Sequence, residues 1–522
     1  MELRQEHARP VWTRYAAVLA PACAIALGAL VRLSRVLRSD FPIGDGGLFY
    51  LMIQELQANQ YRLPAYTAYN AAGIPFAYPP LGLYLAGLVA GLTHQPLIEV
   101  MHFLPVAFNL LTIPAFIGLS RAMLPSKAAA NWAGLAFALL PYSFFWWFMG
   151  GGVTRAPGFL FAVLALWSGY LLYTRRQARY IWPTMAAAGC TVSSHPSMAF
   201  LLAYSLGFFF LAYGLHRRGV LHSLLVAGGT LALSAPWWAT AIARYGVAPL
   251  LSAGGTGTTP RAGLGALGTL LVTVEPYFPL LGGLALLGLL VALKKRHLAL
   301  PGWLLLSFLL DARGALGAGT VPLALLAGLG IDSVVAPWLR RDGQSRAAKG
   351  LALAVAAYVI LYATLGAATG WSEKLRGLSP GEREAMAWVA GNTPPGGRFL
   401  VVSPGEESID YTAEWFPVLA QRVSVTTYQG YEWLGSDVFR CRMDWHAWAE
   451  LYGARGAESL ESWAEQEGLS FDYVYVSKGG SGRKDVEPEV RRWAWRNALA
   501  CDSRYALAYD GPGALIFRRA GQ

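Results

Sequence analysis

The chain has 522 residues, of which 55% are hydrophobic and only 14% are charged. Soluble globular proteins carry roughly 25% charged residues, so most of this chain must lie in lipid. The same composition excludes a disordered or collagen-like protein. Four cysteines are too few for a disulfide scaffold or for a zinc module with paired ligands.

The net charge of +11 is distributed unevenly along the chain. Residues 1–376 contain 27 Lys and Arg against 11 Asp and Glu, whereas residues 377–522 contain 15 against 20. The basic excess therefore belongs to the apolar part, where Lys and Arg mark cytoplasmic loops, and it does not indicate a nucleic-acid partner. We divide the chain into a transmembrane domain, residues 1–376, and a slightly acidic soluble domain, residues 377–522.

Apolar segments recur between residues 15 and 370, and we expect about 11 to 13 membrane spans. The first follows three arginines without a convincing cleavage site, so we interpret it as a signal anchor with its N-terminus in the cytoplasm. Several segments are shorter than the roughly 20 residues of a perpendicular crossing, which leaves the exact count open. The expected spans lie near residues 15–34, 79–93, 99–120, 128–148, 156–173, 180–194, 197–215, 222–242, 264–293, 298–310, 317–338 and 348–370.

Basic clusters between the spans predict which loops are cytoplasmic. The four clusters lie at residues 175–179, 216–218, 294–296 and 340–349. Placing them inside puts residues 149–155, 195–196, 243–263, 311–316 and 377–522 outside. Arg121 and Lys127 do not fit this scheme, so the topology of residues 79–127 stays open.

From residue 377 onward, strand and helix patterns alternate, which is typical of a small α/β domain. Ser379-Pro380-Gly381-Glu382 begins an amphipathic helix that runs through Trp388. Asp510-Gly511-Pro512-Gly513 predicts a hairpin turn between the last two strands. We expect strands at 398–403, 422–426, 472–477, 504–509 and 513–518, and helices near 409–420, 443–466 and 487–499.

Asp45 is the acidic residue whose surroundings most favour chemistry. It precedes residues 48–59, where the apolar positions share one helical face, so we predict a helix that lies on the membrane surface. Gly44, Gly46 and Gly47 would let a substrate approach the backbone closely. The alternative is that Asp45 only caps this helix. The sequence contains no P-loop, no His-Glu-x-x-His and no Cys-x-x-Cys motif, which disfavours a primary pump or a zinc protease with the usual signatures.

This arrangement resembles the GT-C superfamily of membrane glycosyltransferases, whose members include protein O-mannosyltransferases, aminoarabinose transferases and oligosaccharyltransferases. The external loop at 35–78 carries an Asp beside a surface helix, and Tyr78-Pro79-Pro80-Leu81 then enters the second span. The soluble domain is similar to that of bacterial members at Asn392-Thr393-Pro394-Pro395 and at Glu414-Trp415-Phe416-Pro417. The resemblance implies a polytopic α-helical membrane protein of GT-C type in the plasma membrane, with an extracytoplasmic α/β domain.

The resemblance also implies the reaction, an inverting transfer of a hexosyl or pentosyl sugar from a polyprenyl-phosphate donor on the extracytoplasmic side. The acceptor would be a lipid, a glycan or a protein, and Asp45 would be the base that deprotonates its hydroxyl. Members of the superfamily often carry a second acid directly after this Asp, whereas here Gly46 follows. We therefore assign no cofactor and leave a divalent cation open.

Cations are needed to hold the phosphate of such a donor. Arg32, Arg35 and Arg38 are three positions apart and line one side of the first helix end, although they could instead snorkel to lipid headgroups. Arg155 follows three consecutive glycines in a loop expected outside, where it meets phosphate or anchors the chain at the interface. We expect at least one of these arginines to share a water-filled cavity with Asp45, without a tight salt bridge to it.

The remaining candidate substrate-binding residues are Gly46, Gly47, Glu55, Tyr78 and His195. His195 lies between two short spans, where it either lines the cavity or makes a structural hydrogen bond. In the soluble domain, Glu414-Trp415 and Tyr431-Glu432-Trp433 either line an acceptor groove or pack inside the domain.

Two other functions remain open at the sequence level. A transporter or flippase for a lipid-linked saccharide would favour inverted repeats and paired broken helices, and the sequence shows no such symmetry. A non-catalytic membrane scaffold would make Asp45 dispensable. A disulfide between Cys441 and Cys501 also stays open, because an oxidising exterior permits it but spacing alone does not show that the two cysteines are neighbours.

The first testable prediction is topological. Arg340, Arg341, Arg346 and Lys349 precede one last span, so residues 377–522 should be extracytoplasmic. A reporter fused after residue 522 should be active only outside the cytoplasm, and a fusion active only inside would refute the prediction.

Overall fold

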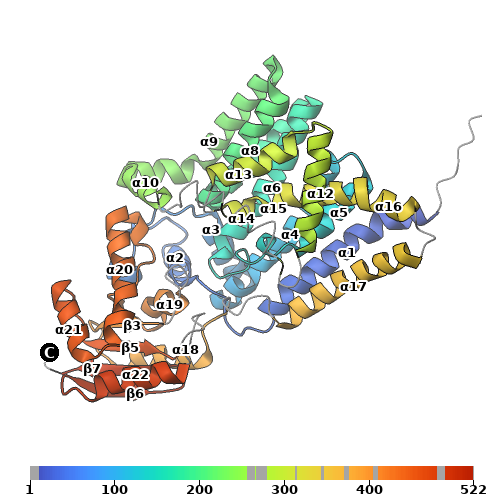
Figure 1. The fold of residues 1–522 in the computed structure, drawn as a ribbon. Helices are drawn as coiled ribbons and strands as arrows, with labels where there is room; N and C mark the ends of the chain where they lie inside the picture. The colour runs from blue at the N-terminus through green and yellow to red at the C-terminus, as the bar shows by residue number, and fades with distance from the viewer. Residues whose placement is uncertain are drawn as a thin grey trace, which may run out of the picture.

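The structure is a computed structural model, drawn as a ribbon in Figure 1. It describes residues 11–255, 265, 275, 279–311, 314–341, 346–369, 376–403, 410–478 and 488–520. Helices form a bundle in the N-terminal part of the chain, and a mixed sheet with its own helices lies at one end of that bundle (Figure 1). Both parts of the expected fold class, the helical membrane part and the α/β part, are therefore present.

Six described helices are long and apolar enough to cross a membrane. They are Leu19–Val36 within α1 (Val11–Val36), α4 (Leu97–Met123), α6 (Gly152–Arg175), Pro196–Gly214 including α8 (Pro196–Phe209), α9 (Arg217–Tyr245), and Ala315–Leu339. The last of these joins α14 (Ala315–Ala318), α15 (Thr320–Gly330) and the start of α16 (Ala336–Arg341). Shorter helices are α3 (Leu81–Thr93), α5 (Lys127–Leu139), α7 (Ile181–Ser194), α10 (Ala248–Gly254), α12 (Leu280–Lys294) and α13 (Ala299–Leu310). The chain is thus a multi-pass membrane protein, and the count of 11 to 13 spans stays a prediction.

Glycines let the bundle helices approach one another closely. A Cβ at Gly288 of α12 would overlap the carbonyl oxygen of Leu326 on α15, and a Cβ at Gly330 would overlap that of Leu284. α17 (Arg346–Thr369) packs beside α1 (Figure 1). Lipid supplies no hydrophobic drive between helices, so such close packing of backbones is a main source of stability.

α2 (Gly47–Ala58) confirms the helix predicted at 48–59. Leu48, Met52, Ile53 and Leu56 are buried on its apolar face. They pack against protein side chains that follow in the same connection between α1 and α3, among them Tyr69 of the short 3-10 helix Tyr69–Ala71. The small antiparallel pair β1 (Tyr66–Thr67) and β2 (Ile74–Pro75) closes this loop.

The C-terminal domain contains a five-stranded sheet in the order β4-β3-β5-β7-β6. β3 pairs in parallel with β4 and β5, whereas β7 pairs antiparallel with β5 and β6 across the predicted hairpin. The strands are β3 (Arg398–Val402), β4 (Val423–Ser424), β5 (Tyr473–Ser477), β6 (Tyr505–Asp510) and β7 (Ala514–Arg519). Each predicted strand is therefore present.

Helices cover both faces of this sheet. Phe399 and Val401 of β3 pack toward α18 (Pro380–Asn392) and α19 (Tyr411–Leu419). Leu400 and Val402 face α20 (Ser436–Gly453), α21 (Ala457–Gln466) and α22 (Pro488–Ala500). A strand buried on both faces is expected to be continuously hydrophobic, which explains the apolar run that predicted β3.

One expectation for this domain was wrong, and one open question is answered. The single helix predicted at 443–466 is two helices, α20 and α21, separated at Gly456, whose φ of 125° is accessible mainly to glycine. Cys441 and Cys501 are both exposed free cysteines, so the disulfide left open above does not form.

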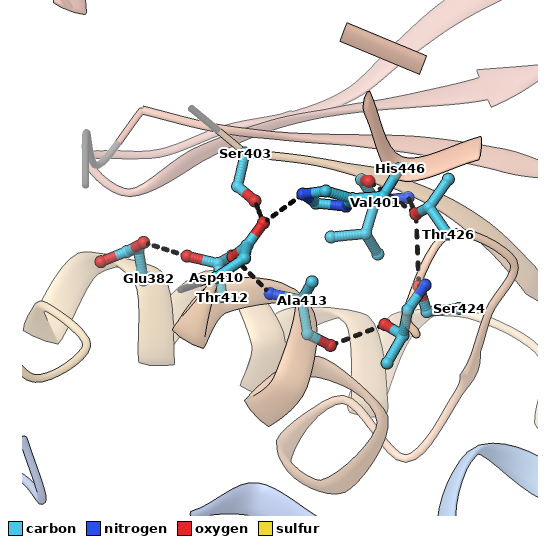
Figure 2. A network of polar contacts seen from close by, with 10 residues as sticks. Glu382, Val401, Ser403, Asp410, Thr412, Ala413, Ser424, Thr426 and His446 are labelled. Carbon is cyan, nitrogen blue, oxygen red and sulfur yellow. Dashed lines mark hydrogen bonds and ion pairs between the residues drawn. The ribbon is translucent and has the colours of Figure 1, made fainter. Parts of the chain in front are cut away.

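Asp410 anchors the N-terminus of α19 from inside the domain. Its carboxylate accepts a hydrogen bond from the Ala413 backbone N–H at 2.9 Å and one from the Ser403 hydroxyl, and it lies 3.1 Å from Nε2 of His446. Figure 2 shows these groups converging on Asp410, next to the hydrogen bond between Thr412 and the buried Glu382. The network fixes the helix that carries Glu414 and Trp415.

This anchor should make the protein sensitive to acid. Burial opposes ionisation of Asp410, but hydrogen bonds from His446, Ser403 and Ala413 outweigh it and lower its pKa below the usual value. A lowered pKa in the folded state adds stability above the unfolded value, and this stability is lost as the pH falls through the folded value. Asp410→Asn should therefore lower the free energy of unfolding at neutral pH by roughly 1–3 kcal/mol. The free energy of unfolding of this variant should also decrease less than that of the wild type as the pH falls. Thermal unfolding of the purified protein between pH 7 and pH 3 measures both effects.

The matched control is Asp437→Asn, because the Asp437 side chain is 93% exposed. It should leave the thermal midpoint and its pH dependence unchanged. If Asp410→Asn behaves like this control, Asp410 is not an anchor of α19.

Candidate active site at the Asp45 loop

Asp45 lies in a short loop between α1 and α2 that runs beside the N-terminus of α6. The Gly150 N–H donates to the carbonyl oxygen of Ile43 at 2.7 Å, and the Gly151 N–H donates to that of Asp45 at 2.9 Å. A Cβ at Gly150 would overlap the Asp45 carbonyl oxygen. The glycines at 150 and 151 thus permit the close contact of two backbones, and the fold brings together the two segments that the sequence selected.

The Asp45 carboxylate binds to the first turn of α6. Its Oδ1 accepts a hydrogen bond from the Gly151 N–H at 3.0 Å, and its Oδ2 forms a salt bridge with Arg155. The side chain of Asp45 is 32% exposed, so water and a substrate group can still reach it. Asp45 does not cap α2, whose N-cap residue is Gly46 without a side-chain hydrogen bond. The alternative that Asp45 only caps α2 is therefore wrong.

The salt bridge also corrects our expectation that Asp45 and the phosphate-binding arginine stand apart. Arg155 lies one helical turn after Gly151, on the same side of α6. A carboxylate bonded to Gly151 is therefore within reach of the guanidinium, and the two opposite charges attract each other. The positive end of the α6 dipole favours an anion at the same place.

Tyr78 lies beside this ion pair, and His195 packs against Tyr78. The Tyr78 hydroxyl is 3.3 Å from that of Thr154, the residue before Arg155. The Tyr78 ring packs edge-on against His195, with ring centroids 6.1 Å apart. Burial raises the pKa of Tyr78, and Asp45 and Arg155 are close enough to act on it in opposite directions. The structure therefore places Asp45, Tyr78, Arg155 and His195 together.

His195 also has the structural role that the sequence left open. Its Nδ1 accepts a hydrogen bond from the Ser197 N–H at 3.2 Å and so caps α8. A neutral His195 must therefore carry its proton on Nε2.

Arg32 does not belong to the site, which corrects its assignment to phosphate binding. It is fully buried, and its guanidinium donates to Asn109 Oδ1 at 2.6 Å, to the Ala138 carbonyl at 2.6 Å and to Ser143 Oγ at 2.9 Å. These partners lie on three other segments of the bundle, so Arg32 joins helices and has no exposed surface for a lipid phosphate.

The other predicted residues hold the loop or lie near it. Glu55 accepts a hydrogen bond from the Ala68 N–H at 2.7 Å, which stabilises the turn after α2. Gly47 has no room for a side chain, because a Cβ there would lie 2.6 Å from the Glu414 carbonyl oxygen. Arg35 lies in the last turn of α1 near Tyr411 and Arg38, and Tyr411 is itself close enough to Asp45 for their charges to interact. Both arginines thus remain candidates for phosphate binding.

The sequence did not select Arg376 at all. Its carbonyl oxygen accepts a hydrogen bond from the Gly44 N–H at 3.0 Å. Its Nε is buried and has no hydrogen-bond partner among the described residues. Its charge acts on Tyr411 together with that of Asp45. The only sequence signal was its place at the boundary where the composition changes.

Glu414 reaches the loop from the C-terminal domain. It is buried, and its Oε1 accepts a hydrogen bond from the Gly46 N–H at 3.0 Å. Burial and the nearby charge of Asp45 raise the pKa of Glu414 to about 8. The sequence indicated Glu414 as a groove-lining or packing residue, and its contact with the Asp45 loop could not be read from spacing.

These residues do not fit a metal centre. Among the described residues, no group of three or more His, Cys, Asp or Glu side chains is placed to hold a metal ion. Gly46 supplies no ligand beside Asp45, and both oxygens of the Asp45 carboxylate are engaged by Gly151 and Arg155.

The fold is that of GT-C glycosyltransferases. No family model and no curated protein sequence matches the chain. ArnT from Cupriavidus metallidurans bound to undecaprenyl phosphate is 14% identical, with a TM-score of 0.55 over 96% of this chain and 97% of ArnT. The Archaeoglobus fulgidus oligosaccharyltransferase in complex with Zn and sulfate is 16% identical, with a TM-score of 0.55 over 96% of this chain and 73% of the other. The mycobacterial arabinofuranosyltransferase AftD is 14% identical, with a TM-score of 0.51 over 98% of this chain and 40% of AftD. The fold class predicted from the sequence is thus confirmed.

The two arginines of this region should differ in their effect on stability. Arg32→Met leaves three buried acceptors without a donor and should lower the free energy of unfolding by roughly 3 kcal/mol or more, since each such group costs about 1–3 kcal/mol. Arg155→Met removes a partly exposed ion pair and should cost about 1 kcal/mol or less. Thermal unfolding in detergent compares the two variants, and equal losses would contradict the distinction between a structural and a site arginine.

Proposed function

We propose that the chain is an inverting glycosyltransferase that moves a sugar from a polyprenyl-phosphate-linked donor to a hydroxyl group of an acceptor. The observation that carries this proposal is the partly exposed Asp45 carboxylate, held at the N-terminus of α6 next to Arg155 in a GT-C fold. A carboxylate and a cation at one site are the two groups that this reaction needs. The complex of ArnT with undecaprenyl phosphate supports a lipid phosphate as the carrier.

In the proposed reaction the acceptor oxygen attacks the anomeric carbon of the donor sugar. Its proton passes to Asp45, which acts as general base. The bond between the anomeric carbon and the phosphate oxygen breaks, and its electron pair leaves with the polyprenyl phosphate. Attack opposite the leaving group inverts the configuration. No step is routed through a metal ion, because the residues around Asp45 do not form a metal site.

Arg155 acts on both charges of this reaction. It pairs with the Asp45 carboxylate until the donor arrives, and its guanidinium fork matches the oxygens of a phosphate. The phosphate of the donor competes with Asp45 for the same cation, so donor binding loosens the ion pair and leaves the carboxylate able to accept a proton. Arg35 and Arg376 add positive charge near Tyr411, and Arg38 lies close to Arg35.

The proposal places the reaction on the extracytoplasmic side of the plasma membrane, where the basic loops put the C-terminal domain. Tyr78, Gly46, Gly47 and His195 line or shape the site rather than take part in proton transfer. Hexosyl and pentosyl donors are both covered, and so are lipid, glycan and protein acceptors, because no contact of the described residues selects among them.

Asp45→Asn tests the proposal. Asn keeps the size of the side chain and an oxygen for the Gly151 N–H, but it cannot accept the acceptor proton, so transfer should fall by roughly 10²–10⁴-fold with normal amounts of folded protein. The assay measures transfer in membranes from a panel of polyprenyl-phosphate sugars.

Asp40→Asn is the control, because Asp40 lies in the same loop and its side chain is 66% exposed. It should transfer sugar at the wild-type rate. Normal transfer by Asp45→Asn would remove its role as base. If the wild-type protein uses no sugar of the panel, the transport or scaffold alternative takes precedence.

A further inference from the structure

We propose that Glu414 is a positioning residue through which the C-terminal domain holds Asp45 in its reactive orientation. This inference rests on the proposed function, because it assumes that Asp45 is the base. It adds that the site is complete only when α19 is docked on the external loop of the membrane domain.

The first support is the contact with the backbone on both sides of Asp45. The Gly46 N–H, directly after Asp45, donates to Oε1 of Glu414 at 3.0 Å. The Gly44 carbonyl oxygen, directly before Asp45, accepts a hydrogen bond from Nε1 of Trp415 at 3.1 Å. Two consecutive residues of α19 therefore fix the peptide groups that flank the base, and the direction of the Asp45 side chain follows from theirs.

Glu414 also supplies the hydrogen-bond acceptor that the N-terminus of α2 lacks. The first N–H groups of a helix have no partner within it, and the N-cap of α2 is Gly46, which has no side chain to accept them. Glu414 accepts from Gly46 and from Leu48 at the start of α2. A helix of the membrane domain is thus capped by a carboxyl group from another domain.

The backbone of Glu414 is itself held by residues of the loop. The Tyr69 hydroxyl donates to its carbonyl oxygen at 2.6 Å, and a Cβ at Gly47 would lie 2.6 Å from that same oxygen. The docking continues at Asn70, whose side chain makes two hydrogen bonds to the backbone of Ser424, at 2.8 and 2.7 Å. Together these contacts restrict the movement of the loop.

The charges around Glu414 give the contact a pH dependence. Asp45 and Arg155 act on it from the membrane domain, and Tyr69 and Tyr428 face it from the loop and from its own domain. The charge of Glu432 also acts on Tyr69. With a pKa raised to about 8, chiefly by burial and then by Asp45, Glu414 is neutral at pH 7, and its oxygen still accepts from Gly46. Above pH 8 it adds a second negative charge beside Asp45, which opposes the binding of an anionic donor.

Two substitutions separate the hydrogen bond from the charge. Glu414→Ala removes the acceptor and should lower kcat by on the order of 10–100-fold, because a displacement of about 1 Å at a site costs up to 10²-fold, while the KM for the acceptor changes little. Glu414→Gln keeps an acceptor oxygen and should retain transfer at pH 7 within a few fold. In the wild type, kcat/KM for the donor should fall as the pH rises through about 8, and in Glu414→Gln this fall should be absent.

Glu458→Ala and Glu458→Gln are the matched controls, because Glu458 is an exposed acid of α21 in the same domain. Both should behave as wild type at every pH. If Glu414→Ala does not accumulate as folded protein, Trp415→Phe replaces it: the ring is kept, the hydrogen bond to Gly44 is lost, and kcat should fall with little change in KM.

The inference is overturned if Glu414→Ala, or Trp415→Phe in its place, transfers at the wild-type rate while Asp45→Asn is inactive. It is also overturned if Glu414→Gln is as impaired at pH 7 as Glu414→Ala, or if it keeps the wild-type pH profile. Failure of the proposed function itself looks different, because Asp45→Asn would then transfer normally.

Discussion

The site depends on how the backbone of residues 43–46 is satisfied. Buried backbone groups must find hydrogen-bond partners, and this loop is too short to provide its own. Its partners come from three places: Gly150 and Gly151 at the start of α6, the carbonyl of Arg376, and the side chains of Glu414 and Trp415. The membrane domain, the connection between the domains and the C-terminal domain therefore meet at one residue, Asp45.

Local features of the fold could be predicted from the sequence, because their causes are local. Helical periodicity located α2, and alternating apolar runs with a Gly-Pro turn located the strands of the C-terminal sheet. The break between α20 and α21 was missed, since it depends on a single positive φ at Gly456. The free cysteines, too, depend on tertiary position and not on spacing.

The candidate site was predictable only in part. Asp45 and Arg155 were selected because glycines surround both, and glycines in contact are what lets the two segments meet. Arg32 was placed in the wrong role, because the same spacing that groups it with Arg35 and Arg38 says nothing about Asn109 or Ser143, which bury it. Glu414 lies 368 positions from its partner Gly46, and no pattern in a single sequence links residues at that distance.

The contrast between Arg32 and Arg155 shows what makes an arginine available for chemistry. Arg32 is surrounded by neutral acceptors, and removing any one of them leaves a buried polar group unpaired, so its position is fixed by the fold. Among the described residues, Arg155 forms its salt bridge with the partly exposed Asp45, and this partner can be exchanged for another anion at little cost, because both pairs are partly solvated. Under the proposed mechanism, this exchange couples donor binding to proton transfer. The donor phosphate binds Arg155 and thereby releases Asp45 to act as the base. Because Asp45 and the donor phosphate compete for Arg155, any change that strengthens the Asp45–Arg155 pair weakens donor binding to the same extent. The loop that Glu414 holds therefore sets both the reactivity of the base and the affinity for the donor.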